Sequence, residues 1–245
     1  MSLHSLPDPW PRMLVTLASD PGTPGWPNED YACVAPDAAV LLDGATTVPR
    51  HADTGCEHGV AWYARTLGTA LLAGITAEPR PPLAGALADA IAQVRDQHEG
   101  TCDLTHPATP AATVTAVRAE PGGIGYLVLS DSSVAADFGD GRPPLVLTDR
   151  HPAARASPDA AADAATGTIP RAGLRGVALL SDGATRITDL YHVLTWPAVI
   201  DVIRDHGPAE LIRQVRATEA SDPDGGRWPR AKLSDDATAL YWHLT

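Results

Sequence analysis

The segment Val40-Leu41-Leu42-Asp43-Gly44 places an aspartate directly after a run of apolar residues. The same arrangement recurs at residues 127–132, 177–183 and 233–238. Strands this apolar are normally buried on at least one face, so their ends bring carboxylates towards an interior where unpaired charge is costly. Lys and Arg are scarce around these segments, and oxygen ligands suit hard cations. The pattern therefore predicts a site for Mg²⁺ or Mn²⁺.

An aspartate followed by glycine is also an ordinary turn signal, and for any one of these segments the turn is the preferred interpretation. Four such strand ends, together with the acidic segment Asn28-Glu29-Asp30, favour a shared site instead. Asp235 and Asp236 are adjacent and point to opposite sides of a strand, so only one of them can bind the ion directly.

The order of these segments resembles that of the metal-dependent protein phosphatases, the PPM family of type 2C serine/threonine phosphatases. The resemblance runs from about Leu14 to Leu244. No single motif is specific, but the whole series in this order is hard to obtain by accident. The chain is identified as a divergent, bacterial-type member. The matching motifs are Asn28-Glu29-Asp30, Leu42-Asp43-Gly44, Ala111-Ala112-Thr113-Val114-Thr115-Ala116, Ser130-Asp131-Ser132, Leu180-Ser181-Asp182-Gly183 and Asp235-Asp236-Ala237-Thr238.

The resemblance implies a two-ion centre of Mn²⁺ or Mg²⁺ in which Asp43 bridges the ions and the Gly44 carbonyl ligates one of them. Asp182 and Asp235 complete the ligands and, with Asp43, are the expected catalytic residues. Asp30 would hold metal-bound water. Two such ions polarise a phosphoryl group and generate hydroxide for in-line attack, so no protein nucleophile is needed. The expected metal-binding set is Asp30, Asp43, Gly44, Asp182 and Asp235, with Glu29 and Asp131 as further candidates.

Two departures from the family pattern affect the expected site. The family commonly has an arginine shortly before the first acidic motif to hold substrate phosphate, but residues 23–27 contain no base. Arg50 is the candidate substrate-binding replacement. Arg186 lies where many members carry an acidic residue, so a third ion on Asp131 would lose a co-ligand. Two ions are therefore expected, and a third is less favoured.

These observations leave two functions open. The first is a phosphatase that hydrolyses phosphoserine or phosphothreonine in proteins, with a phosphorylated protein as its partner. The second is a phosphatase-like regulatory binding module that is catalytically weak or inactive, suggested by the altered sequence around Gly25 and after Gly44. Because a pure scaffold gains little from keeping several buried carboxylates, the enzyme is favoured.

Length and composition set the remaining expectations. The chain has 245 residues, 44% of them hydrophobic, which fits one domain spanning residues 1–245. A net charge of −12 with no basic patch argues against nucleic-acid or anionic-membrane partners. Three cysteines without paired spacing suit a reducing cytoplasm, and no apolar stretch is long enough to span a bilayer. A soluble, cytoplasmic, monomeric signalling protein is expected.

Apolar periodicity predicts an α+β fold. Residues 31–42, 113–129 and 135–148 read as hairpins, and residues 56–75 and 83–94 as helices, while Pro197 and Pro208 suit the first turns of two more. Residues 150–175 resemble a mobile surface segment. Together with the resemblance, the pattern implies a four-layer α/β/β/α sandwich in which two stacked, mainly antiparallel sheets are covered by helices.

Other phosphatase chemistries lack their motifs. Leu41 stands where a haloacid-dehalogenase phosphatase needs a second aspartate, and Cys56 lacks the histidine before it and the arginine after it that a cysteine phosphatase requires. No Gly-x-Ser-x-Gly motif occurs for serine hydrolysis. The segment Cys56-Glu57-His58 lacks the second pair of ligands that zinc needs, and on a helix its Cys and His would face different ways. A structural role is therefore expected for it.

Overall fold

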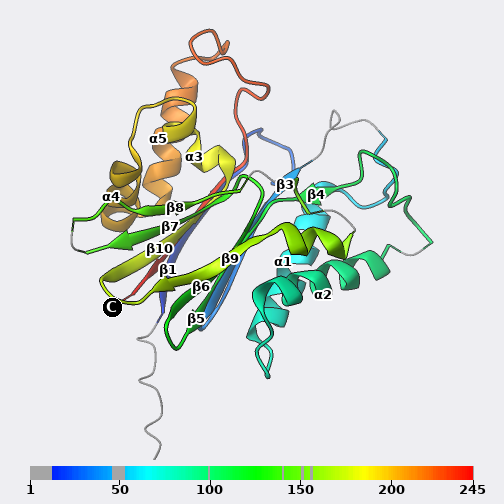
Figure 1. Cartoon of the computed structure of the whole chain (residues 1–245). Coiled ribbons are helices and arrows are strands. Elements are labelled where there is room, and N and C mark those ends of the chain that lie inside the picture. The colour runs from blue at the N-terminus through cyan, green and yellow to red at the C-terminus, as the bar shows by residue number, and fades with distance from the viewer. Residues whose placement is uncertain are drawn as a thin grey trace, which may run out of the picture.

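The computed structural model describes residues 13–45, 53–98, 100–139, 141–149, 152–154 and 157–244. Within them the strands form two antiparallel sheets, here called sheet I and sheet II, which Figure 1 shows stacked face to face. Sheet I has the strand order β1-β11-β10-β7-β8. Its strands are β1 (Leu14–Asp20), β11 (Ala237–His243), β10 (Leu174–Leu180), β7 (Ser133–Phe138) and β8 (Leu145–Leu147).

Sheet II has the order β2-β3-β5-β6-β9, and the short strand β4 pairs with the end of β3. Strands β2 and β3 form the hairpin expected from the sequence, as do β5 with β6 and β7 with β8. The strands of sheet II are β2 (Asp30–Ala35), β3 (Ala38–Ala45), β4 (Ala111–Ala112), β5 (Val114–Glu120), β6 (Gly123–Leu129) and β9 (Ala165–Pro170).

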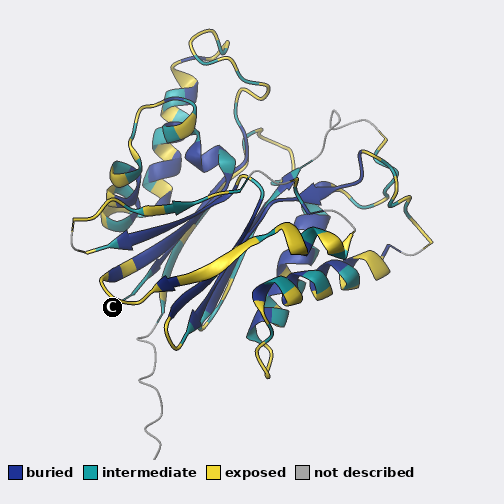
Figure 2. Ribbon diagram, in the orientation of Figure 1, coloured by how far each residue is buried: buried dark blue, intermediate teal, exposed yellow. Residues whose placement is uncertain are grey.

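Helices cover the outer face of each sheet. Helices α1 (Val60–Thr76) and α2 (Leu83–Asp96) pack on sheet II, while α3 (Asp182–Asp189), α4 (Trp196–His206) and α5 (Pro208–Ala220) pack on sheet I. A third apolar cluster, with Leu41, Val128 and Leu179 fully buried, fills the space between the sheets. The chain thus has the expected α+β, four-layer sandwich, with its buried residues along the sheet interiors (Figure 2).

The helices follow from their apolar spacing, with one correction. Val60, Tyr63, Leu67 and Leu71 recur at helical intervals and are buried on one side of α1. The helix begins at Val60 rather than at Cys56, so the segment before it is not helical. Proline occupies the first turn of both α4 and α5, as predicted. Helix α3, which starts at the Ser181-Asp182-Gly183 motif, was not expected as a helix.

The prediction of a mobile surface segment at residues 150–175 is wrong for its described part. Residues Pro158–Asp163 form a 3-10 helix and β9 pairs with β6 over its whole length, from Ala165 opposite Val128 to Pro170 opposite Gly123. Strand β9 is at the edge of sheet II and is exposed at most positions, which Figure 2 shows in yellow. Its exposed threonines, Thr166 and Thr168, suit this edge position.

No helix among the described residues is long and apolar enough to cross a membrane.

Candidate functional site

The β2–β3 hairpin brings the first two predicted residues together. Asp30 begins β2 directly opposite Asp43 near the end of β3. Asp30 is only 7% exposed, and the hydroxyl of Ser181 donates a 2.8 Å hydrogen bond to its Oδ2. Its Oδ1 is buried and has no hydrogen-bond partner. A buried carboxylate oxygen without a donor is expensive, so this atom calls for a proton or a cation.

Electrostatics join four carboxyl groups into one set, here called the acidic cluster. Burial is the main cause that raises the pKa of Asp30 to about 7. Burial also raises the pKa of Asp43 well above its ordinary value, and the charges of Asp30, Asp182 and Asp235 raise it further. Burial and the charge of Asp235 raise the pKa of Asp182. The acidic cluster consists of Asp30, Asp43, Asp182 and Asp235.

The two sheets contribute equally to this cluster. Asp30 and Asp43 come from sheet II, whereas Asp182 begins α3 just after β10, and Asp235 lies just before β11 in sheet I. Adjacent strand ends of two stacked sheets therefore meet at one edge of the sandwich. Burial, and after it the repulsion between neighbouring carboxylates, therefore makes the charged form of these groups costly there.

Gly44 fits only because it lacks a side chain. A Cβ at this position would lie 2.5 Å from a methyl group of Val60 and 2.7 Å from the carbonyl oxygen of Glu29. The Gly44 amide donates to that same carbonyl at 3.1 Å. Close packing of Gly44 against Glu29 thus holds the end of β3 beside the first acidic motif, and places Glu29 next to the acidic cluster.

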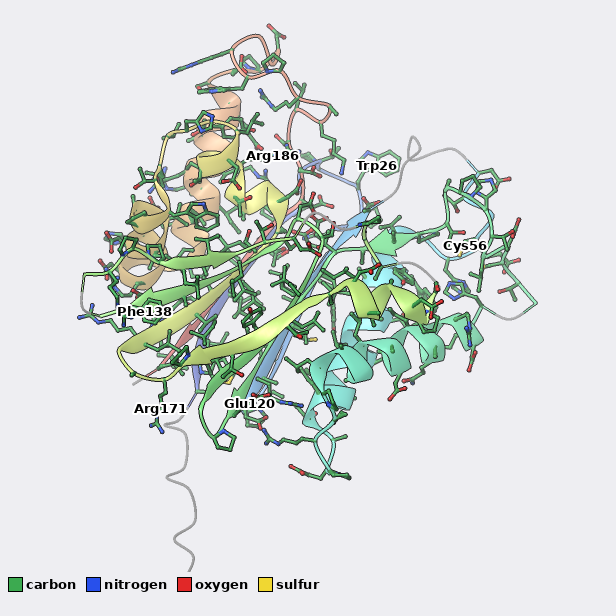
Figure 3. The ribbon with its side chains drawn as sticks, viewed as in Figure 1. Trp26, Cys56, Glu120, Phe138, Arg171 and Arg186 are labelled. Atoms are coloured by element: carbon green, nitrogen blue, oxygen red, sulfur yellow. The ribbon has the colours of Figure 1, made fainter. Side chains whose placement is uncertain are left out.

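Asp235 differs from the other members because two cations hold it. Arg186 donates to its Oδ2 at 2.6 Å and Lys232 to its Oδ1 at 2.7 Å. The Arg186 side chain is 13% exposed, and Figure 3 shows it pointing from α3. Burial lowers the pKa of Lys232, but the hydrogen bond to Asp235 and the charges of Asp43 and Glu29 raise it overall. The prediction that basic residues are scarce around the acidic segments is therefore wrong for Asp235.

Asp236 has a different task from its neighbour. Its Oδ1 accepts the Gly22 amide and its Oδ2 accepts the Glu29 amide, each at 2.8 Å. Both carboxylate oxygens are therefore used to hold the connection between β1 and β2. This leaves Asp235, whose charge acts on Asp43 and Asp182, as the member of the pair that faces the acidic cluster.

The remaining sequence candidates lie at the margin of the site or outside the described residues. Asp131 is exposed, and its charge contributes to the raised pKa of Asp182. Arg50 lies outside the described residues. Sequence reasoning missed Ser181, which holds Asp30, and Lys232, which holds Asp235. The available signals were the serine directly before Asp182 and the lysine three positions before Asp235.

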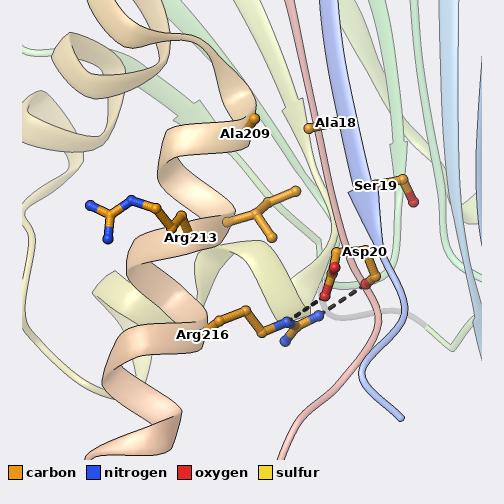
Figure 4. Close-up of a pocket in the computed structure, with 7 residues that line it drawn as sticks. Ala18, Ser19, Asp20, Ala209, Arg213 and Arg216 are labelled. Atoms are coloured by element: carbon orange, nitrogen blue, oxygen red, sulfur yellow. Dashed lines mark hydrogen bonds and ion pairs between the residues drawn. The ribbon is translucent and has the colours of Figure 1, made fainter. Parts of the chain in front are cut away.

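A separate hollow lies between β1 and α5 (Figure 4). It has a volume of about 350 Å³, and no member of the acidic cluster lines it. Arg216 on its wall donates to the Asp20 carboxylate at 2.7 Å and to the Asp20 carbonyl at 2.9 Å. Arg213, the second arginine of the hollow, pairs with Glu210 at 2.6 Å, so both bases are already engaged and the hollow is not part of the acidic site.

A family model described as protein phosphatase 2C matches residues 23–216 of the chain. This range contains Asp30, Asp43 and Asp182 but ends before Asp235. No curated protein matches the sequence.

Solved structures share the fold at low sequence identity. The PPM Ser-Thr phosphatase MsPP from Mycobacterium smegmatis, solved in complex with cacodylate, is 20% identical with a TM-score of 0.66, over 95% of this chain and 98% of that one. The catalytic domain of the serine threonine protein phosphatase PstP, in complex with 2 manganese ions, is 16% identical with a TM-score of 0.64, over 95% and 98%. PppA of Pseudomonas aeruginosa is 16% identical with a TM-score of 0.65, over 96% and 99%.

Proposed function

The chain belongs to the protein phosphatase 2C family, and from this premise we propose that it is a metal-dependent phosphatase acting on phosphoserine or phosphothreonine in proteins. The observation that carries the proposal is the acidic cluster, in which the pKa values of Asp30, Asp43 and Asp182 are raised and Asp30 Oδ1 is buried without a partner. Arg186 and Lys232 contact only Asp235 among these carboxylates. The excess negative charge therefore suits divalent cations.

The donor set fits Mn²⁺ or Mg²⁺, which prefer carboxylate and carbonyl oxygens. Asp43, Asp182 and Asp235 would hold the ions together with the Gly44 carbonyl, and two ions are proposed. Bound cations would stabilise charge on the phosphoryl group and make water reactive near neutral pH. Glu29 and Asp131 remain candidate further ligands.

The chain's own groups would orient and move protons around these ions. Burial raises the pKa of Asp30 to about 7 in the ion-free protein, and the hydroxyl of Ser181 fixes which of its oxygens stays available to hold a proton or a bound water. Arg186 and Lys232 hold the Asp235 carboxylate in one orientation. A carboxylate oxygen has two lone pairs, so an ion bound by Asp235 would share an oxygen with one of these two cations.

Capture of the substrate phosphate is the open part of the proposal. Among residues 23–27, which precede the first acidic motif, there is no base. Arg50 is proposed as the group that binds phosphate, since a guanidinium offers a two-pronged, charge-assisted contact. The proposal also retains a phosphorylated protein as substrate, a cytoplasmic location, a monomer and a single domain over residues 1–245.

A second candidate is a phosphatase-like regulatory module with weak or no turnover. The contacts from Arg186 and Lys232 favour it, because they already neutralise the Asp235 carboxylate without a metal ion. A module of this kind would keep the fold and recognise a phosphorylated protein without hydrolysing it.

Hydrolysis of a phosphothreonine peptide and of a small aryl phosphate, each with Mn²⁺, with Mg²⁺ and with a chelator, separates the two candidates. The phosphatase requires metal-dependent turnover that is lost in Asp43→Asn and kept in Asp89→Asn, an exposed aspartate on α2. If no phosphoester is hydrolysed at any metal concentration while the protein remains folded, the regulatory module replaces the enzyme.

A further inference from the structure

A second group of metal-binding side chains lies away from the acidic cluster. Two residues from the segment before α1 and two from the segment after α2 place their ligand atoms within 4.8 Å of one another. Figure 3 shows Cys56, in the segment before α1, well apart from Arg186, which contacts the acidic cluster. The group, here called the Cys-His cluster, consists of Cys56, His58, His98 and Cys102.

The structure corrects two reasons for treating Cys56 and His58 as merely structural. They precede α1, which begins at Val60, so helical geometry does not separate their side chains. The second pair of ligands, absent from their own segment, is supplied by His98 and Cys102 from beyond α2. The two pairs are far apart in sequence, and the packing of α1 against α2 together with the hydrogen bond from the Asp103 amide to the Gly55 carbonyl, 2.7 Å, brings them together.

The distances within the cluster suit a single tetrahedral ion. The Cys102 Sγ lies 3.6 Å from His58 Nδ1, and the Cys56 Sγ lies 3.9 Å from the same nitrogen. Around Zn²⁺, with bonds of about 2.3 Å to sulfur and about 2.0–2.1 Å to nitrogen, neighbouring ligand atoms are about 3.3–3.8 Å apart. The two sulfur atoms, 3.1 Å apart, need only a small side-chain rotation to reach this spacing.

The surroundings of the histidines also match those of metal ligands. His98 is 2% exposed, and its Nδ1 is 2.8 Å from the Val94 carbonyl oxygen. A ring N–H that donates to a carbonyl leaves Nε2 as the unprotonated nitrogen, as is usual for a histidine bound to a metal. Trp62 stacks on His58 at 4.0 Å and meets His98 edge-on at 4.9 Å, which fixes both rings.

One sulfur receives further stabilisation. The Glu57 amide donates to Cys102 Sγ at 3.3 Å, and the Thr101 hydroxyl lies 3.6 Å from the same atom. Donors directed at sulfur favour the thiolate, which is the form that binds metal.

We propose that Cys56, His58, His98 and Cys102 bind one Zn²⁺. Zinc prefers thiolate and imidazole ligands, and this site offers two of each. Mg²⁺ prefers oxygen ligands and would not compete for them. All four positions of a tetrahedron are filled by the protein, so the site is structural and leaves no place for a substrate. The inference does not rest on the proposed phosphatase activity.

A disulfide between Cys56 and Cys102 is the competing state. Its sulfur atoms would be about 2.05 Å apart, clearly closer than the observed 3.1 Å. A disulfide would also give no reason for two histidines to converge on the same point. Zinc accounts for all four side chains.

The first test is the zinc content of the protein purified without chelator from zinc-supplemented cells. We expect one zinc per chain in the wild type, loss of that zinc in Cys102→Ser and in His98→Gln, and full retention in two controls. The first control is Cys33→Ser, which removes the cysteine that instead donates to the Gly68 carbonyl. The second control is Asp43→Asn, which shows that the zinc is not held by the acidic cluster. Equal zinc in all these variants, or none in the wild type, overturns the proposal.

A cluster variant that does not fold would lose zinc for a trivial reason. A second test therefore measures the binding of Co²⁺ to the reduced, zinc-free wild type. A thiolate-to-cobalt charge-transfer band that is unchanged in Cys33→Ser supports the site, and its absence overturns it. Thiols are also counted in denaturant before any reductant is added. Three reactive thiols agree with the proposal, because the chain has three cysteines, whereas a single reactive thiol shows the disulfide and overturns it.

Discussion

The acidic cluster and the Cys-His cluster differ in how they tolerate the absence of a cation. In the acidic cluster, carboxyl groups are crowded at buried strand ends, and burial and mutual repulsion raise the pKa values of Asp30 and Asp43, so charge there is costly without a cation or a proton. In the Cys-His cluster the ligands can be neutral thiols and imidazoles, so crowding costs little. The comparison suggests that the first centre exchanges hard ions from solution, while the second holds one soft ion as part of the fold.

Asp43→Asn should have the largest effect and should act on the first cluster alone. Because Asp43 is the carboxylate on which the charges of three other members act, its loss removes the centre of the expected site. Changing an outer partner of a metal ligand typically costs about 10–100-fold in affinity or activity, so loss of a direct ligand should lower kcat/KM by more than about 100-fold. Phosphopeptide hydrolysis with Mn²⁺ measures this. The zinc content of Asp43→Asn should equal that of the wild type. A loss of zinc together with activity would show that the two clusters are not independent.

Cys102→Ser should act on the second cluster and reduce stability. By the loop-closure argument used for cross-links, tying residue 56 to residue 102 contributes up to about 4 kcal/mol to the free energy of unfolding. At about 2–4 °C per kcal/mol for a chain of this size, Tm should fall by up to about 8–16 °C. Calorimetry with Cys33→Ser as the matched control checks this. A Tm equal to that of the control would mean that the cluster contributes nothing to the fold.

The pH dependence of stability should report the excess charge of the acidic cluster. Without added divalent cations, Asp30 has a pKa of about 7 in the folded state, against 3.8 for an ordinary aspartate. The folded state therefore binds more protons, and its stability is full below the lower value and is lost as pH rises through the higher one.

Tm should thus fall between about pH 4 and about pH 7.5 and level off above that, and the part above about pH 6.5 lies above the ordinary histidine pKa. Asp30→Asn should flatten this part of the profile, and saturating Mn²⁺ should do the same in the wild type by neutralising the cluster. An unchanged slope in the variant would show that Asp30 is not the group responsible.

Arg186→Gln should produce the smallest effect, on Mn²⁺ affinity. Arg186 contacts one of the two Asp235 oxygens and offsets its charge, so its removal should tighten Mn²⁺ binding by roughly three- to tenfold, on the order of 1 kcal/mol. Calorimetric titration compares it with Arg213→Gln, whose guanidinium pairs with Glu210 on the surface of α5. Weaker binding in Arg186→Gln would show that the guanidinium orients Asp235 rather than competing for it.

The four-layer architecture and the residues of the acidic cluster were expected from the resemblance to the family, and for Asp43, Asp182 and Asp235 also from their places after apolar segments. Asp30 and Asp43 are paired by one short hairpin, so their proximity follows from local pattern. Periodicity also located α1 and α2, although it extended α1 back over Cys56. The metal-ligand roles of the acidic residues stay predictions.

What the sequence could not predict depends on contacts between distant segments. The partners of Cys56 lie beyond α2, and no periodic pattern links two loops that meet through helix packing and loop-to-loop hydrogen bonds. The contact of Arg186 with Asp235 likewise depends on where α3 starts relative to β11. Strand β9 was missed because an exposed edge strand lacks the alternation that marks a half-buried one.

The two hydrogen bonds accepted by Asp236 give the sandwich a mechanical property. They hold both ends of the crossover from β1 in sheet I to β2 in sheet II, and the Ser181–Asp30 bond ties the same edge a second time. A change in the distance between the sheets therefore changes the distance between the carboxylates of the acidic cluster. A bulkier residue in the inter-sheet core, for example at Ala136, should weaken ion binding from a distance, because it would push the sheets apart and so separate the carboxylates at their edge.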